Sequence, residues 1–125
     1  MFGHAAVTPG ERQVLLRLQC QALRYFLDNQ LPSGLVLDRQ RNRGLLRFTG
    51  LCSTAATGMG CIALALASAP PYRLLSPSEA LTRVRSTVET ALERLPHDRG
   101  IMPHFLDART GCTWGADQLS TVDSA

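Results

Sequence analysis

The sequence contains no lysine, so arginine supplies all 13 of its positive side chains. Against 10 acidic residues these give a net charge of only +3, and the densest basic stretch, residues 39–43, falls in an expected loop. Aromatic residues make up 6% of the chain, which is few for a surface that stacks on bases. Since nucleic-acid binding depends on concentrated positive charge, we expect no nucleic-acid partner.

Signals for metals, disulfides and membranes are also missing. The four cysteines include no CxxC pair, and the three histidines have no metal-ligand spacing to them. Three of the cysteines lie in or beside apolar stretches, which favours buried free thiols over a disulfide or a metal site. No apolar run is long enough to cross a bilayer, and no secretory signal is visible at the start. We therefore expect no metal, no cofactor and no membrane partner, and the sequence leaves the compartment open.

Apolar residues make up 45% of the 125 positions, enough for one domain with a buried core. A first helix is expected from Pro9 to about Asn29, because Thr8 and Glu11 form a capping box at its start. Its apolar positions recur every three and four residues and predict one buried stripe. These positions are Val14, Leu15, Leu18, Ala22, Tyr25 and Phe26. Residues 34–52 follow as a structured loop.

A second helix is expected from the N-cap Ser53 to about Ser68. It carries no charged residue, which predicts burial on every side, with close packing at Gly58 and Gly60.

A third, amphipathic helix is expected to begin at the capping box Ser76–Glu79 and to end near Leu95. Its predicted buried stripe consists of Ala80, Leu81, Val84, Val88, Ala91 and Leu92.

Two short extended pieces around the turn 107–111 predict a β-hairpin near residues 101–114, and Ser120 is an expected N-cap of a fourth helix. A buried helix alternating with an amphipathic one is the layout of an α/α toroid, in which outer helices surround inner ones. We therefore predict an all-α domain over residues 1–125. It would be an incomplete α/α toroid of three helices, the start of a fourth and a short β-hairpin.

Four segments, in this order and at these distances, resemble motifs of the bacterial glucoamylase-like family, (α/α)6-barrel proteins that include endo-β-1,2-glucanases. The family patterns read T-G-L-x-x-D-R, S-x-A-x-x-G-f-g, H-F-l-D-x-x-x-G and E-x-S-T-x-D-T-A. The matching segments are SGLVLDR (33–39), CSTAATGMG (52–60), GIMPHFLDARTG (100–111) and QLSTVDSA (118–125). Gln118 stands where the pattern has glutamate, and Ser124 where it has threonine.

The resemblance covers roughly residues 20–125 and only the first third of such a barrel. It implies the N-terminal part of a glycoside hydrolase-like barrel acting on β-glucans, most of all β-1,2-glucan, and inactive by itself. The implied partner is a glucan or oligosaccharide substrate.

Glycoside hydrolysis needs a proton donor at the leaving oxygen and a second carboxylate that attacks or activates water. The best candidate for a catalytic carboxylate is Asp123, one turn into the expected fourth helix, followed by Asp117 and Asp38. The resemblance implies a set of substrate-binding side chains at the same rim. These are Asp38, Arg39, His104, Asp107, Trp114 and Gln118.

Five of the candidates have a purely structural alternative. Asp38 and Arg39 could form a local ion pair, and His104 could be a half-buried residue that holds the hairpin. Asp107 could stabilise its own turn, and Asp123 could occupy a first helical turn. A second function also stays open: a non-enzymatic helical interaction module that associates with itself through exposed apolar helices.

Overall fold

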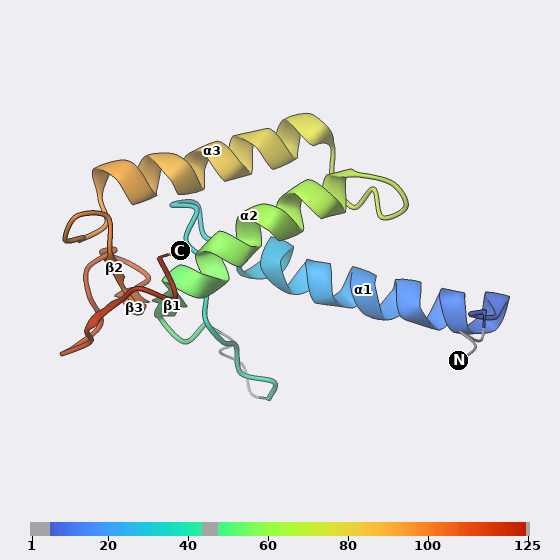
Figure 1. Ribbon diagram of the computed structural model, residues 1–125, viewed down its shortest axis with the longest axis horizontal. Coiled ribbons are helices and arrows are strands. Elements are labelled where there is room, and N and C mark those ends of the chain that lie inside the picture. The colour runs from blue at the N-terminus through green and yellow to red at the C-terminus, as the bar shows by residue number, and fades with distance from the viewer. Residues whose placement is uncertain (1–5, 44–47, 125) are drawn as a thin grey trace, which may run out of the picture.

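The computed structural model describes residues 6–43 and 48–124. Within these residues the chain forms helices α1 (Pro9–Asn29), α2 (Thr54–Ser68) and α3 (Pro77–Glu93). Helix α2 packs against both α1 and α3 (Figure 1). Four short strands gather where α2 begins, and they are β1 (Leu51–Ser53), β2 (Met102–Pro103), β3 (Phe105–Asp107) and β4 (Leu119–Ser120). No helix of the described part is long and apolar enough to cross a membrane.

The helices begin where the sequence predicts. In each case the N-cap hydroxyl accepts a hydrogen bond from the backbone N–H three residues on, which satisfies one of the free donors of the first turn. At the start of α1, the carboxylate of Glu11 completes the reciprocal capping box. At the start of α3, Glu79 instead pairs with Arg83, 2.8 Å away. The three N-caps are Thr8, Ser53 and Ser76.

The predicted turn at 107–111 is present, and one antiparallel bridge between Leu106 and Thr113 closes it as a hairpin. The backbone N–H of Gly111 donates to the carbonyl of Asp107 over 2.8 Å. The strands themselves pair over longer distances in the sequence: β3 runs antiparallel to β1, and β2 antiparallel to β4. These ladders attach the segment after α3 to the residues just before α2.

The expected loop 34–52 supplies the centre of the core. Its first part, residues 35–37, is buried between the helices, where the N–H of Val36 donates to the hydroxyl of Thr57 over 3.0 Å. Residues 44–47 of this loop lie outside the described residues. The larger apolar cluster consists of Leu35, Leu37, Cys52, Leu95, Leu106 and Ala108.

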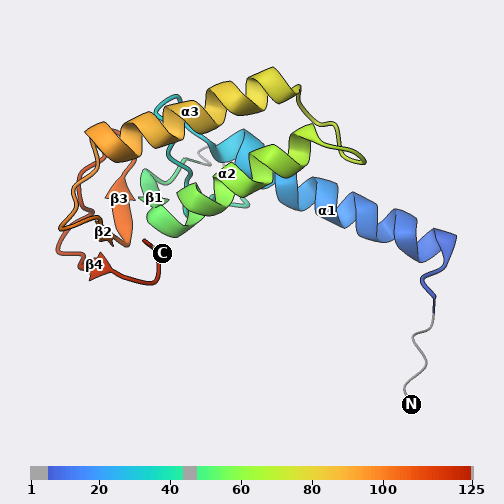
Figure 2. The ribbon, with the colours of Figure 1, turned by 45° about the horizontal axis from the view of Figure 1, so that its top comes forward.

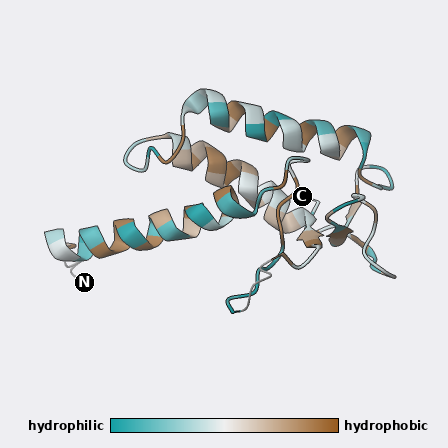
Figure 3. Cartoon of the chain, turned by 180° about the vertical axis from the view of Figure 1, so that it is seen from behind, coloured by the Kyte–Doolittle hydropathy of each residue, from teal (hydrophilic) through white to brown (hydrophobic). Residues whose placement is uncertain are grey.

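The prediction that α2 is buried on every side is wrong. One face packs against α1, α3 and the segment 35–37, but the opposite face is open, although the helix is apolar along its length (Figure 3). Close packing holds at Gly60, where a Cβ would lie 2.8 Å from a methyl group of Val36, whereas Gly58 has nothing within 4 Å. The exposed large side chains are Met59, Ile62 and Leu66, at 54, 55 and 49% exposure.

The predicted stripe of α1 is buried only at its C-terminal end. The N-terminal half of the helix extends beyond α2 and α3 (Figure 2), so Val14, Leu15, Leu18 and Ala22 are exposed. Leu23 is the buried apolar residue of this helix, with Phe26 and Leu27 packed beside it.

The predicted stripe of α3 is wrong at three of its six positions, because Leu81, Val88 and Leu92 are exposed. Ala80 is buried as predicted, but the other buried residues of the helix are Thr87 and Thr90. The Thr87 hydroxyl donates to the carbonyl of Gly34 over 2.8 Å, and that of Thr90 donates to the carbonyl of Ser33. Buried threonines are tolerated here because the buried loop offers backbone acceptors to them.

Candidate functional site

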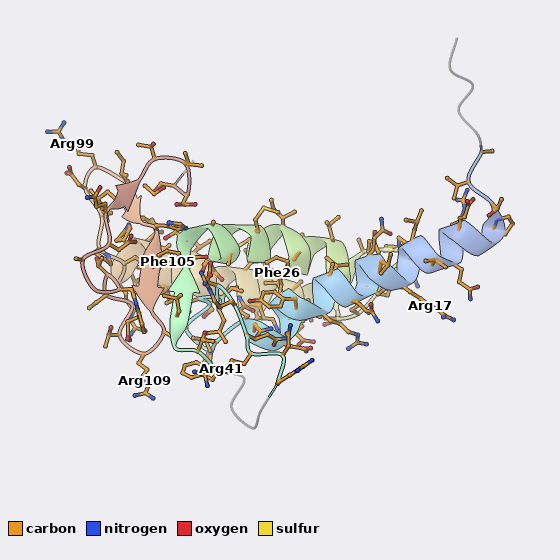
Figure 4. All side chains as sticks on the ribbon, turned by 90° about the horizontal axis from the view of Figure 1, so that it is seen from below. Arg17, Phe26, Arg41, Arg99, Phe105 and Arg109 are labelled. Carbon is orange, nitrogen blue, oxygen red and sulfur yellow. The ribbon has the colours of Figure 1, made fainter. Side chains whose placement is uncertain are left out.

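Five side chains form a continuous strip beside the start of α2, which we call the His104 strip: Asp123, His104, Phe105, Arg39 and Asp38. The Nε2 atom of His104 lies 3.8 Å from Oδ2 of Asp123, within ion-pair range when the imidazole is protonated. The imidazole stacks on Phe105, with centroids 3.9 Å and planes 17° apart. The Arg39 guanidinium lies 6.0 Å from the Phe105 centroid and pairs with Asp38 over 2.7 Å. Figure 4 shows Phe105 beside the strands.

The strands and the start of α2 position the strip. The N–H of His104 donates to the carbonyl of Gln118 over 3.3 Å, and its own carbonyl accepts from the N–H of Thr54 over 3.0 Å. The N–H of Asp123 donates to the hydroxyl of Ser120 over 3.3 Å, so Ser120 caps the turn formed by residues 121–124. Residues from three separate stretches of sequence thus meet at one end of α2.

The strip alternates charged and aromatic groups. The side chain of Asp123 is 14% exposed and that of His104 is 43% exposed, so the imidazole covers a carboxylate that still reaches solvent. Carboxylate, imidazole and guanidinium groups together donate and accept the hydrogen bonds that sugar hydroxyls make. Phe105 has His104 on one side and Arg39 within cation–π distance, so it is not free to stack on a pyranose ring.

Among the described contacts, the side chains of Asp107 and Trp114 make no hydrogen bond or ion pair with the side chains of this strip, although the N–H of Trp114 donates to the carbonyl of Phe105. Asp107 accepts hydrogen bonds from the N–H groups of Arg109 and Thr110, both over 2.9 Å. It therefore stabilises its own turn, which is the structural alternative given for it above. These hydrogen bonds lower the pKa of Asp107 because they stabilise its charged form. Trp114 is half exposed and lines a cleft of about 400 Å³ together with Phe48, Asp107 and Arg109.

Asp117 and Gln118 contact the strip through its backbone. The Asp117 carboxylate accepts from the N–H of Phe105 over 2.5 Å. Gln118 contributes its backbone carbonyl to His104, while its side chain is exposed.

A cleft of about 620 Å³, which was not predicted from the sequence, lies between α1 and the segment 37–40. Gln21, Arg24 and Asp28 line it from one face of α1, a polar spacing of three and four residues that could have indicated it. Tyr25 also lines it and donates its hydroxyl to the carbonyl of Leu37 over 2.7 Å. Burial, with Asp38 nearby, raises the pKa of Tyr25.

The cysteines of the described residues are free thiols. Cys52 is buried, and burial, reinforced by Asp107 and Asp38, raises its pKa to about 12. Cys20 and Cys61 are half-buried, but Cys112 is exposed. The expectation of buried free thiols is therefore met fully at Cys52 and only in part at the other cysteines. Among residues 6–43 and 48–124, no group of three or more His, Cys, Asp or Glu side chains is placed to hold a metal ion.

Comparison with solved structures confirms the predicted fold. A glucoamylase-like protein from Bacteroides uniformis matches with a TM-score of 0.73 at 21% identity, over 97% of this chain and 29% of its own. An endo-β-1,2-glucanase from Chitinophaga pinensis, solved with sophorotriose and glucose, matches with a TM-score of 0.70 at 22% identity, over 90% of this chain and 27% of its own. A glucoamylase-like protein from Bacteroides fragilis matches with a TM-score of 0.66 at 20% identity, over 100% and 29%.

The chain therefore has the fold of one part of a glucoamylase-like α/α toroid. It spans less than a third of the length of these three proteins. No family model matches the sequence. No curated protein matches it either.

Proposed function

We propose that this chain forms part of the wall of a carbohydrate cleft in a glycoside hydrolase-like toroid acting on β-glucans, with β-1,2-glucan as the favoured substrate. The observation that carries the proposal is the His104 strip, in which Asp123, His104 and Arg39 meet at one end of α2. The likeness in fold to an endo-β-1,2-glucanase solved with sophorotriose supports the choice of linkage.

Four members of the strip have direct roles in this proposal. Asp123 is the catalytic carboxylate of the cleft, because it is the more buried member of its pair and still reaches solvent. His104 and Arg39 bind hydroxyl groups, and Asp38 orients the Arg39 guanidinium through their ion pair. Trp114 supplies an apolar face in the cleft of about 400 Å³ that it lines, and Asp107 stabilises the turn at 107–111.

We expect the chain alone to bind glucan without hydrolysing it. Hydrolysis needs two carboxyl groups held at a fixed separation across the sugar. The Asp117 carboxylate, the second candidate, is bonded to a backbone N–H, and the chain corresponds to less than a third of each related toroid.

NMR titration of the 125-residue chain with linear β-1,2-gluco-oligosaccharides tests the proposal. Signals of His104 and Arg39 should shift with β-1,2-linked but less with β-1,4-linked oligosaccharides, and no shorter products should appear. Asp123→Asn should weaken binding, whereas Asp98→Asn, an exposed carboxylate on the turn after α3, should not. Absence of any shift at millimolar oligosaccharide would refute the glucan-binding role.

A second candidate function is an interaction module that associates with a second copy of itself through α2. The observation in its favour is an uncharged, exposed face on this helix, the α2 seam, with the heptad-like spacing that helix pairing uses. Its residues are Gly58, Met59, Ile62, Ala65 and Leu66.

Light scattering after size-exclusion chromatography tests this second function. A dimer that Ile62→Glu converts to monomer would support it, provided that Leu81→Glu, at an equally exposed apolar position on α3, leaves the dimer intact. A monomer at every concentration would exclude it.

A further inference from the structure

The segment 113–118 holds the backbone on which the His104 strip is built. The carbonyl of Phe105 accepts from the N–H of Trp114 over 3.0 Å, and its N–H donates to the carboxylate of Asp117. One residue earlier, the N–H of His104 donates to the carbonyl of Gln118. The peptide groups on both sides of Phe105 are thus fixed by a single short stretch of chain.

One of these three bonds uses a side chain, and that side chain is Asp117. Backbone partners would survive any substitution on the segment, but the Phe105 N–H keeps its partner only while position 117 carries an acceptor. Asp117 also accepts no bond from a side chain of the strip among the described contacts. A catalytic carboxyl group must reach the substrate, whereas this one is engaged by the backbone N–H of Phe105.

We propose that Asp117 is a positioning residue: by accepting the N–H of Phe105, it fixes the His104–Phe105 stack and thereby the approach of His104 to Asp123. The meaning of this geometry for sugar binding rests on the function proposed above. The sequence pattern offers Asp117 as a second catalytic carboxylate, and the geometry instead gives it a task that needs an oxygen acceptor and no proton transfer.

Asp117→Asn and Asp117→Ala separate the two roles. The asparagine carbonyl can accept the same hydrogen bond without charge or acidity, whereas alanine leaves the N–H of Phe105 without a partner. In NMR spectra, Asp117→Asn should keep the ring-current shifts of the His104 protons and the slow exchange of the Phe105 amide. Asp117→Ala should move both, with amide exchange faster by about tenfold, the equivalent of one charge-assisted bond. Asp98→Ala, which removes an exposed carboxylate from a nearby turn, is the matched control and should change neither.

Oligosaccharide affinity distinguishes a positioning role of Asp117 from a role that needs its charge. Asp117→Asn should bind β-1,2-gluco-oligosaccharide within about twofold of the unsubstituted chain, and Asp117→Ala about tenfold more weakly. Equal loss of affinity in both variants would overturn the proposal, because the charge itself would then be required. Unchanged His104 shifts in Asp117→Ala would overturn it as well.

Two further outcomes remain decisive. If Asp117→Ala does not fold, Asp117→Asn decides alone, since altered His104 shifts in that variant contradict the positioning role. If the unsubstituted chain binds no oligosaccharide, the proposed function fails, but the His104 and Phe105 spectra still decide whether Asp117 positions the stack.

Discussion

Gly34 is a position at which a single added methyl group should strongly reduce the stability of the fold. Its φ is +85°, a left-handed conformation that costs a residue with a Cβ about 1–2 kcal/mol. A Cβ there would also lie 2.5 Å from Cα of Thr87 and 2.7 Å from the carbonyl carbon of Ser86. Because these are backbone atoms of α3, relief requires the helix and the buried segment 35–37 to move apart.

The expected cost of Gly34→Ala follows from these two contributions. Displacement of packed elements typically costs a further 1–3 kcal/mol or so, which gives a total of about 2–5 kcal/mol. That is a large part of the roughly 5–15 kcal/mol by which domains are stable. The same shift would weaken the hydrogen bond from the Thr87 hydroxyl to the Gly34 carbonyl. It would also displace the segment that leads to Asp38 and Arg39.

Gly100→Ala is the matched control. Gly100 has a φ of +88° but nothing within 4 Å of the place a Cβ would take, so alanine there meets the conformational cost of about 1–2 kcal/mol without a clash. Urea denaturation followed by circular dichroism measures both variants, and the smaller freedom of alanine in the unfolded chain cancels between them. If Gly34→Ala destabilises the chain no more than Gly100→Ala, the close packing of this loop against α3 is refuted.

Three further predictions concern the loop, the turn and the thiols. Thr57→Val should lower the free energy of unfolding by about 1–3 kcal/mol, since it leaves the buried N–H of Val36 without its acceptor. Thr82→Val, on the exposed side of α3, should lower it little in the same denaturation assay. Asp107→Asn should reduce the stability of the chain above about pH 4, because the pKa of this carboxyl group is lowered in the folded state. The difference in stability from the unsubstituted chain should disappear as acid protonates the carboxyl group. A difference that persists at low pH would contradict this explanation. In mass spectra after alkylation near pH 8, Cys112 should react readily and Cys52 only after unfolding, and rapid labelling of Cys52 would show that it is not buried.

The starts of the helices could be predicted from the sequence because their signals are local. Ser53 and Ser76 each cap the helix that follows them, and this needs no knowledge of the rest of the chain. The buried faces could not be predicted in the same way. Helix α3 buries Thr87 and Thr90 because a loop more than fifty residues earlier presents its carbonyl groups to them. Apolar periodicity therefore selected Leu81 and Leu92, which face outward.

The candidate site illustrates the same limit. Asp38, His104 and Asp123 are far apart in the sequence, and no spacing rule relates them. They could be selected together only through the resemblance of four motifs to one family. The ladders β1–β3 and β2–β4 then supply the physical reason that they meet. The bond from Phe105 to Asp117 had no signal in the sequence at all.

The attachment of His104 and Pro103 to Thr54 has a consequence for the order in which the chain folds. Thr54 makes both contacts: its N–H donates to the His104 carbonyl, and its hydroxyl donates over 2.6 Å to the carbonyl of Pro103, which lies 49 positions later. Helices form from near neighbours, but contacts between distant residues must wait until the intervening chain has been made and its loop has closed. During synthesis, α1 to α3 can therefore assemble first, with the start of α2 still open to water. The end of α2 beside the His104 strip is then completed in a late step, when residues 103–120 have left the ribosome and closed over it.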